Sequence, residues 1–361
     1  MFDLKVCMSG GIEIGDYIYL TSINLNGLFR FDKKKSKLQF LCTFSEEDPS
    51  YALYNGAFSY GDEIWFVPQH GKQIAIYNIK TGNIEYVSPV YEEKYEITFD
   101  KIHTLAFSSG MIDESHFYIL PAGVDAAMIV DMGTREIKTI NHIIGKGEYI
   151  WTGEYHNGII HAFTGDGKWR IEINPDTLSY ERVEWTDKPV TDVVWNDHWK
   201  KYIVSSAREN YITIFDENFK NPQIIAYRDS IDGRSLRGRI FSKGKDVFAV
   251  IRYSNAIERI DIEKKSTDRI LLENIESQPY FEKVQSNEHI IGISITDNTL
   301  VYYENDSQEW CVQLLVADFK EIYDYSVSKG KKPADLFWSG NVMREGDVSL
   351  KGFLEYISIM G

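Results

Sequence analysis

The stretch that decides the fold begins Asp16-Tyr-Ile-Tyr-Leu-Thr21, continues as Gly27-Leu-Phe-Arg-Phe-Asp32 and ends Leu38-Gln-Phe-Leu-Cys42. Apolar and other side chains alternate along these pieces, which is the period of a β-strand with one buried face. The residues between the pieces are polar or small, as in tight turns. The stretch therefore predicts three antiparallel strands joined by short turns.

The same order of features recurs along the whole chain of 361 residues. Each copy contains a strand that ends in an apolar residue followed by an acidic or amide residue, which can start the next turn by accepting backbone hydrogen bonds. The steps between these landmarks are 46, 53, 43, 42, 45 and 43 residues. Blades of a β-propeller need about 40–50 residues, whereas ankyrin and leucine-rich repeats are shorter. The landmark residues are Asp32, Asn78, Asp131, Asn174, Asp216, Asp261 and Glu304.

A further apolar stretch precedes the three strands of each copy, as in residues 53–61, 102–110 and 235–244. We align 53–61 with 102–110 residue for residue and interpret these stretches as innermost strands, where small residues are expected because the strands converge on an axis. Four strands per copy and seven copies predict an all-β fold. We expect a seven-bladed β-propeller of four-stranded antiparallel blades over residues 1–316.

The repeat period resembles that of the WD40 and kelch propellers over residues from about 4 to 316. The Gly-His and Trp-Asp pairs of WD40 repeats are absent, and the kelch double glycine occurs once, as Gly10-Gly11. The chain is most similar to uncharacterised bacterial propeller proteins whose blades have lost such marks. A fold of this kind carries many unrelated functions, so the resemblance implies the architecture and names no activity.

Residues 317–361 depart from the repeat and predict a C-terminal tail. The run Asp318-Phe-Lys-Glu-Ile-Tyr-Asp-Tyr325 predicts one or two helical turns. Ser349 is a suitable N-cap for a short amphipathic helix over 349–357, which we expect to pack on the propeller. The helix could close the ring between the last and first blades, or it could bind a partner.

The composition restricts the compartment and the partners. A net charge of −15 disfavours nucleic acid as a partner, since phosphate backbones bind clustered Lys and Arg. No segment has the length of a membrane span or the pattern of a signal peptide. The three cysteines are far apart, which suits a reducing compartment. We therefore expect a cytoplasmic protein, by default a monomer, that contacts neither membrane nor nucleic acid.

The eight histidines show no HExxH motif and no paired spacing with carboxylates. His156 and His161, for example, flank a turn from which their side chains leave toward opposite faces. Gly-rich phosphate loops are also absent. The sequence therefore predicts no metal site and no cofactor.

A site is expected at one mouth of the central channel, where the innermost strands begin. Aromatic side chains there could stack on a flat or sugar-like face, while charged and amide groups hold polar atoms. The alternative is that these residues pack between blades and cap the channel, since a slip of one residue reverses every face. The candidate ligand-binding residues are Tyr54, Asn55, His103, Trp151, Asp192, Arg237 and Glu282.

These features favour a non-catalytic binding propeller that presents its channel mouth or rim to a protein or a small polar ligand, for instance a saccharide. No residue is assigned a catalytic role. The alternative is an enzyme, a hydrolase or lyase acting on a carbohydrate-like substrate, with Asp192 and Glu282 facing each other across the channel. A third hypothesis is an assembly role for the C-terminal helix.

Overall fold

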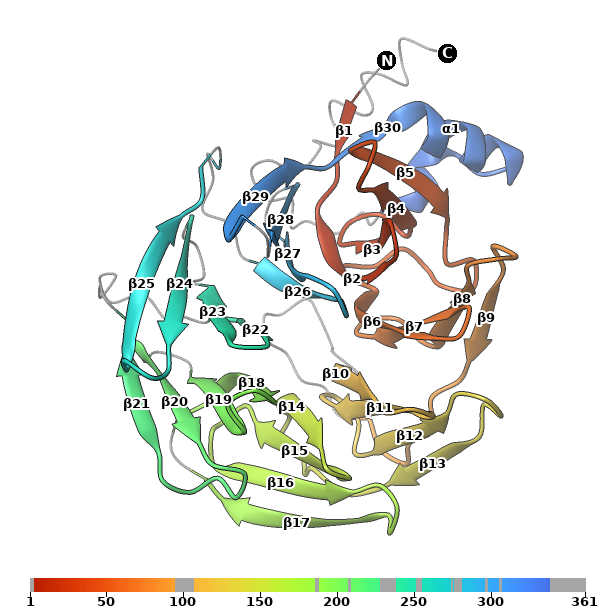
Figure 1. The fold of residues 1–361 in the computed structure, drawn as a ribbon. Helices are drawn as coiled ribbons and strands as arrows, with labels where there is room; N and C mark the ends of the chain where they lie inside the picture. The colour runs from red at the N-terminus through yellow and green to blue at the C-terminus, as the bar shows by residue number, and fades with distance from the viewer. Residues whose placement is uncertain are drawn as a thin grey trace.

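The strands form small antiparallel sheets arranged around a central axis, and the chain runs from sheet to sheet around the ring (Figure 1). The fold is all-β with four-stranded sheets and a C-terminal helix, as predicted. This computed structural model describes residues 3–94, 107–185, 188–206, 209–227, 238–250, 255–273, 275, 281–295, 298–304 and 307–337.

The described residues contain seven groups of four consecutive strands, and each group is called a blade below and numbered in chain order. The seven-blade count stays a prediction, with which these groups agree. The innermost strands are β2 (Met8–Ile14), β6 (Tyr54–Tyr60), β10 (Phe107–Ile112), β14 (Ile150–His156), β18 (Val190–Asn196), β22 (Ile240–Lys243) and β26 (Phe281–Gln285). The second strands are β3 (Tyr17–Ser22), β7 (Glu63–Pro68), β11 (His116–Pro121), β15 (Ile159–Thr164), β19 (Lys201–Ser206), β23 (Asp246–Val250) and β27 (Ile290–Ser294). The third strands are β4 (Leu28–Asp32), β8 (Ile74–Asn78), β12 (Ala127–Asp131), β16 (Trp169–Asn174), β20 (Tyr211–Phe215), β24 (Ala256–Asp261) and β28 (Thr299–Glu304). The outermost strands are β5 (Lys37–Cys42), β9 (Ile84–Val87), β13 (Ile137–Ile140), β17 (Ser179–Glu184), β21 (Gln223–Ala226), β25 (Ser266–Leu271) and β29 (Glu309–Leu314).

The predicted landmark residues lie where the third strand of each blade ends. Asp32, Asn78 and Asn174 close β4, β8 and β16, and each accepts backbone N–H groups of the following turn. The Lys80 N–H, for example, donates to Asn78 Oδ1 at 3.0 Å. Asp216 directly follows β20 and accepts the Lys220 N–H at 2.8 Å. The repeat was therefore placed correctly because its turns are fixed by local hydrogen bonds.

Glycines let neighbouring blades approach closely near the axis. A Cβ on Gly153 of β14 would lie 2.6 Å from Leu120 Cδ1 of β11, and one on Gly110 of β10 would lie 2.5 Å from Val67 Cγ2 of β7. In both cases an innermost strand packs against the second strand of the preceding blade. Small residues near the axis were expected, and the structure confirms them.

Each junction between consecutive blades holds a hydrophobic cluster. Trp65 of blade 2 packs edge-on against Phe117 of blade 3, with ring centroids 5.7 Å apart. The junction between the last and first blades is filled in the same way, with Val284 and Ile291 beside Leu20. Apolar burial at about 25 cal/mol per Å² makes these clusters the main source of cohesion between blades.

The ring closes through both ends of the described chain. The innermost strands β2 and β26 pair in parallel, which joins blades 1 and 7 into one ten-stranded sheet. At the outer edge of blade 1, β30 (Val316–Asp318) pairs with β5 and with β1 (Asp3–Lys5) (Figure 1). Closure thus uses strand pairing at the axis and at the rim.

A short tail covers the outer face of blade 1. Helix α1 (Phe319–Ser328) begins at the N-cap Asp318, buries Phe319 and Ile322, and packs beside β5. Glu321 accepts the Phe40 N–H at 3.0 Å. The 3₁₀ turn η1 (Pro333–Leu336) follows. The helical turns expected after Asp318 are present and longer than predicted, whereas the helix expected over 349–357 lies outside the described residues.

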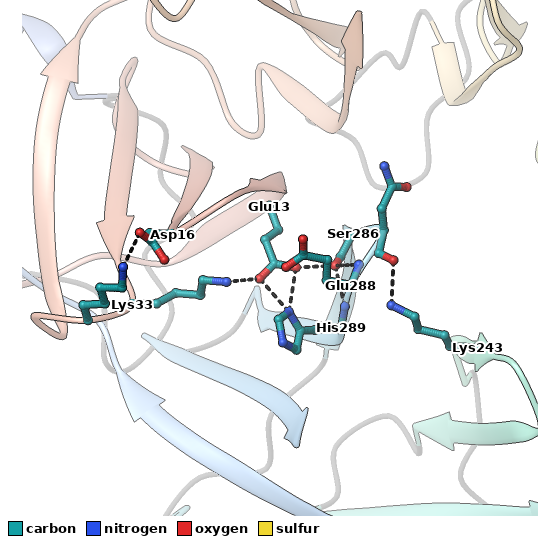
Figure 2. A network of polar contacts seen from close by, with 9 residues as sticks. Glu13, Asp16, Lys33, Lys243, Ser286, Glu288 and His289 are labelled. Atoms are coloured by element: carbon teal, nitrogen blue, oxygen red, sulfur yellow. Dashed lines mark hydrogen bonds and ion pairs between the residues drawn. The ribbon is translucent and has the colours of Figure 1, made fainter. Parts of the chain in front are cut away.

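A buried carboxylate, Glu13 on β2, links blade 1 to blade 7 (Figure 2). His289 Nδ1 lies 2.8 Å from Glu13 Oε1, the Ser286 hydroxyl donates to Oε2, and the Lys33 ammonium forms an ion pair with Oε1. Ser286 and His289 belong to the β26–β27 turn of blade 7. Burial raises the pKa of the Glu13 carboxyl, but the hydrogen bonds from Lys33, Ser286 and His289 outweigh it, so the pKa is lowered.

Replacing Glu13 with Gln should weaken this closure. A carboxyl whose folded-state pKa is depressed adds stability above its unfolded pKa and loses that contribution as the pH falls. We expect E13Q to lower the free energy of unfolding by about 2 kcal/mol near neutral pH, with the difference shrinking below about pH 4.5. Urea unfolding across pH measures this. The exposed Glu136→Gln variant is the control, and equal losses at acid and neutral pH would contradict the prediction.

Candidate functional site

A cavity of about 400 Å³ lies on the axis of the ring, lined by residues of the innermost strands. Strands β2, β6, β10, β14, β18 and β26 all contribute, together with Arg239 just before β22. We call this space the channel cavity. Its wall combines apolar side chains such as Phe58 and Trp151 with hydroxyl groups such as Ser108 and Ser109. This mixture is typical of pockets for small ligands.

Bulges in three innermost strands, β6, β10 and β14, carry residues that line the cavity. In β14 the register with β15 shifts between Ile150 and Thr152, so Trp151 is the extra residue of a bulge. The same shift occurs in β10 between Phe107 and Ser109. A bulge places one extra residue in the strand and redirects its side chain. Trp151 and Ser108, the residues at these bulges, both line the channel cavity.

One wall of the cavity is a set of matched ion pairs. Lys283 Nζ lies 2.7 Å from Asp192 Oδ2, and the Arg239 guanidinium lies 2.6 Å from Glu282 Oε2, with a second contact of 3.0 Å to Oε1. The Ile240 N–H also donates to Asp192 Oδ2 at 2.7 Å. Two-point contact between guanidinium and carboxylate fixes both groups. This wall is therefore rigid and its charges compensate one another.

Glu154 on β14 is an acidic residue of the cavity that takes no part in these ion pairs. The Trp195 N–H donates to its Oε1 at 3.1 Å, and among the described residues no Lys or Arg forms an ion pair with it. Burial raises the pKa of Glu154 to about 7, while the Lys283 ammonium opposes the rise and Asp192 adds to it. Near neutral pH its carboxyl can therefore either donate or accept a proton.

The structure brings four of the predicted residues to the channel cavity: Asn55, Trp151, Asp192 and Glu282 all line it. Whether they bind a ligand stays a prediction. Tyr54 does not line the cavity, because its ring is fully buried between blades, 4.5 Å from the ring centroid of Phe44. His103 and Arg237 lie outside the described residues.

The alignment of residues 53–61 with 102–110 was wrong. Tyr54 pairs with Pro68, and its structural counterpart is Phe107, which pairs with Pro121 in the same way. The sequence alignment had instead matched Phe58 with Phe107. Both strands carry a bulge of one extra residue, and matching residues of β6 and β10 lie 53 positions apart throughout, like the landmarks Asn78 and Asp131. The error arose because Ala-Phe-Ser occurs at 57–59 and again at 106–108, which suggested a shorter spacing.

Sequence reasoning missed several polar residues of the cavity, among them the charged Glu154, Arg239 and Lys283 and the hydroxyl-bearing Ser108 and Ser109. Arg239 lies two positions after the predicted Arg237 in the sequence, and Arg237 is outside the described residues. Lys283 directly follows Glu282, a predicted residue. The raised pKa of Glu154 depends on burial by neighbouring blades, and no local pattern reports that.

No protein-family model matches the chain, and no curated protein sequence matches it. Solved structures do resemble it. Virginiamycin B lyase from Staphylococcus aureus is 10% identical with a TM-score of 0.62, over 82% of this chain and 96% of that protein. PorZ of the Porphyromonas gingivalis type-IX secretion system is 11% identical with a TM-score of 0.59, over 86% of this chain and 38% of that protein.

A loop variant of Hsv2 from Kluyveromyces lactis is 12% identical with a TM-score of 0.53, over 86% of this chain and 97% of that protein. At these identities the likeness shows the fold alone. The chain is a β-propeller with a polar cavity on its axis. No family model supports the resemblance to WD40 or kelch propellers.

Glu154 makes a testable contribution to the pH dependence of stability. Because its pKa is raised when the protein folds, the folded state holds a proton that the unfolded state releases, and stability falls as the pH rises from about 4.5 to about 7. We expect E154Q to exceed the wild type in unfolding free energy by at most about 3 kcal/mol near pH 8 and to equal it near pH 4. Urea unfolding at several pH values tests this. A difference independent of pH would contradict it, and E136Q again serves as the control.

Proposed function

We propose that the protein binds a small, uncharged, polyhydroxylated ligand of the saccharide class in the channel cavity. The observation that carries the proposal is a pair of buried hydroxyls on the cavity wall. Ser108 Oγ and Ser109 Oγ are shielded from solvent and have no hydrogen-bond partner among the described residues. Buried polar groups normally have partners, and rotation of these side chains about χ1 would turn their hydroxyls toward a ligand in the cavity that supplies hydroxyl groups.

The charges of the cavity favour an uncharged ligand. Asp192 and Glu282 are already paired with Lys283 and Arg239, so neither pair needs a charged ligand to balance it. The net charge of −15 also repels polyanions. Trp151 offers an aromatic face of the kind that packs against the apolar face of a sugar ring.

Thermal unfolding against a panel of mono- and oligosaccharides tests the proposal. A ligand that binds only the folded state adds about 2.7 kcal/mol of stability at a hundredfold excess over its dissociation constant. We expect Trp151→Ala to abolish this ligand-dependent increment. The control is Trp199, which does not line the channel cavity and whose indole N–H donates to the Lys245 carbonyl. The Trp199→Ala variant should retain the increment.

Two results would contradict this function. The first is that no saccharide raises the unfolding midpoint of the wild type, and the second is that the increment survives Trp151→Ala unchanged. In either case a protein partner at the channel rim becomes the better proposal, and crosslinking through the rim would be the next measurement.

A second candidate is an enzyme that uses Glu154 as an acid or base. The supporting observation is its pKa of about 7 beside the Asp192–Lys283 pair, since efficient proton transfer requires a pKa near the working pH. The resemblance to virginiamycin B lyase extends to the fold and does not carry the activity of that protein to this chain.

If the ligand is also turned over, Glu154→Gln should reduce kcat by about 10²- to 10⁴-fold while leaving ligand affinity within a few-fold of the wild type. The kcat of the wild type should also titrate with an apparent pKa near 7. Turnover measured by product formation, with affinity measured by calorimetry, separates the two effects. Retained kcat in E154Q would exclude Glu154 from proton transfer.

The compartment and the partners stay proposals. Cys7, Cys42 and Cys311 form no disulfide bonds, which supports a reducing compartment such as the cytoplasm. No helix among the described residues has the length and apolarity needed to cross a membrane.

A further inference from the structure

Three side chains from separate connections meet where blade 2 joins blade 3, away from the channel cavity. Glu92 follows β9, Asp125 lies between β11 and β12, and His142 follows β13. His142 Nδ1 lies 3.2 Å from Asp125 Oδ2, and His142 Nε2 lies 3.4 Å from Glu92 Oε2. One donor atom from each residue falls within 4.8 Å of the other two.

Asp125 is the buried member of this group and is incompletely paired. Its side chain has an exposed fraction of 0%. Oδ1 accepts the N–H groups of Glu92 at 3.2 Å and Glu93 at 3.0 Å, whereas Oδ2 accepts no hydrogen bond from the described part of the chain and is turned toward His142. An unsatisfied oxygen on a buried carboxylate is costly, so Oδ2 points to a missing positive partner.

The charges at this junction also favour a cation. Glu92 and Asp125 form no ion pair with Lys or Arg among the described residues. Glu13, Glu288 and His289 provide the same residue types within the same distances, but there the Lys33 ammonium and the Ser286 hydroxyl already occupy Glu13 (Figure 2). Of these two groups among the described residues, the Glu92 group is the one that combines donor atoms with an unbalanced negative charge.

We infer that Glu92, Asp125 and His142 bind a divalent transition-metal ion, and that the ion is Zn²⁺. One imidazole nitrogen and two carboxylate oxygens form a mixed donor set that suits zinc better than the all-oxygen sets of calcium and magnesium. Glu92 and His142 are exposed, so their rotation can bring the donors to the ~2.0–2.2 Å that zinc requires. A water molecule would complete the tetrahedron.

Neighbouring groups contact the Glu92 carboxylate and the His142 backbone. The Asn141 side-chain amide donates to Glu92 Oε1 at 2.6 Å, and the Tyr180 hydroxyl donates to the His142 carbonyl at 2.8 Å. Such contacts orient metal ligands and raise affinity. A bound ion would link the connection after β9, which carries Glu92, to the residues of blade 3 that carry Asp125 and His142. Its role would thus be to stabilise a junction between blades.

Equilibrium dialysis of the metal-stripped full chain against Zn²⁺ tests the site, with thermal unfolding and Co²⁺ absorption as second readouts. We expect Zn²⁺ to bind tightly at one site per chain, to raise the unfolding midpoint, and to bind at least 100 times more tightly than Mg²⁺. His142→Gln and Glu92→Gln change exposed side chains and should each weaken binding by about 10- to 100-fold. Co²⁺ should give the visible bands of tetrahedral coordination, and His142→Gln should remove them.

Two histidine variants serve as controls. His116→Gln removes a histidine that faces a single carboxylate, Asp113, and His289→Gln removes the histidine of the Glu13 network. Both should bind Zn²⁺ as the wild type does. Asp125→Asn keeps an acceptor for the backbone N–H groups and should fold but bind weakly.

The inference fails if His142→Gln and Glu92→Gln bind Zn²⁺ like the wild type, or if the loss follows His289→Gln instead. It also fails if Zn²⁺ leaves the unfolding midpoint unchanged while acidification raises it in the wild type and not in His142→Gln. That result would mean that protonated His142 alone supplies the positive charge between the two carboxylates.

Discussion

The close approach of blades near the axis is the constraint on which the rest of the structure depends. Around Gly110 and Gly153 there is no room for a Cβ, because side chains from the preceding blade fill that space. Close packing there lets the hydrophobic clusters at the junctions form without voids. It also leaves a small central space whose wall is built from strand residues held by backbone pairing. A ligand there would meet a largely preformed surface.

The bulges of the innermost strands reconcile this packing with a polar cavity. A regular strand would send alternate residues toward the two neighbouring blades, and every large side chain would be absorbed by the junctions. The extra residue at the bulges of β14 and β10 breaks that alternation, and Trp151 and Ser108 line the cavity as a result. The ion pairs of Asp192 and Glu282 then fix the opposite part of the wall without leaving a net charge.

The fold could be predicted from the sequence because its repeat is local. Asp32, Asn78 and Asn174 start turns through hydrogen bonds to residues two or three positions away, so their spacing reports the repeat directly. The cavity was harder to predict. The similar Ala-Phe-Ser runs at 57–59 and 106–108 matched Phe58 with Phe107, whereas the structure matches Tyr54 with Phe107 and buries Tyr54 between blades.

Properties that arise between distant residues had no sequence signal at all. The pKa of Glu154 depends on burial by neighbouring strands and on Lys283 and Asp192, which lie in other blades. The group of Glu92, Asp125 and His142 forms from three connections, and no short spacing resembles a metal-binding motif. Local patterns therefore predict the scaffold, whereas the chemistry of this protein depends on how the blades meet.

The pairing of Asp3 with Asp318 in β1 and β30 bears on how the molecule assembles. Contacts between residues so far apart in sequence carry a large loop-closure cost until the intervening chain is ordered. We therefore expect the blades in the middle of the sequence to form first and the pairing of β1 with β30 to form last. Strands β1 and β30 are each only three residues long. We therefore expect their amide hydrogens to exchange with solvent faster than those of the longer strands. A circular permutant with its new termini in a distant turn would move this closure to a different pair of blades.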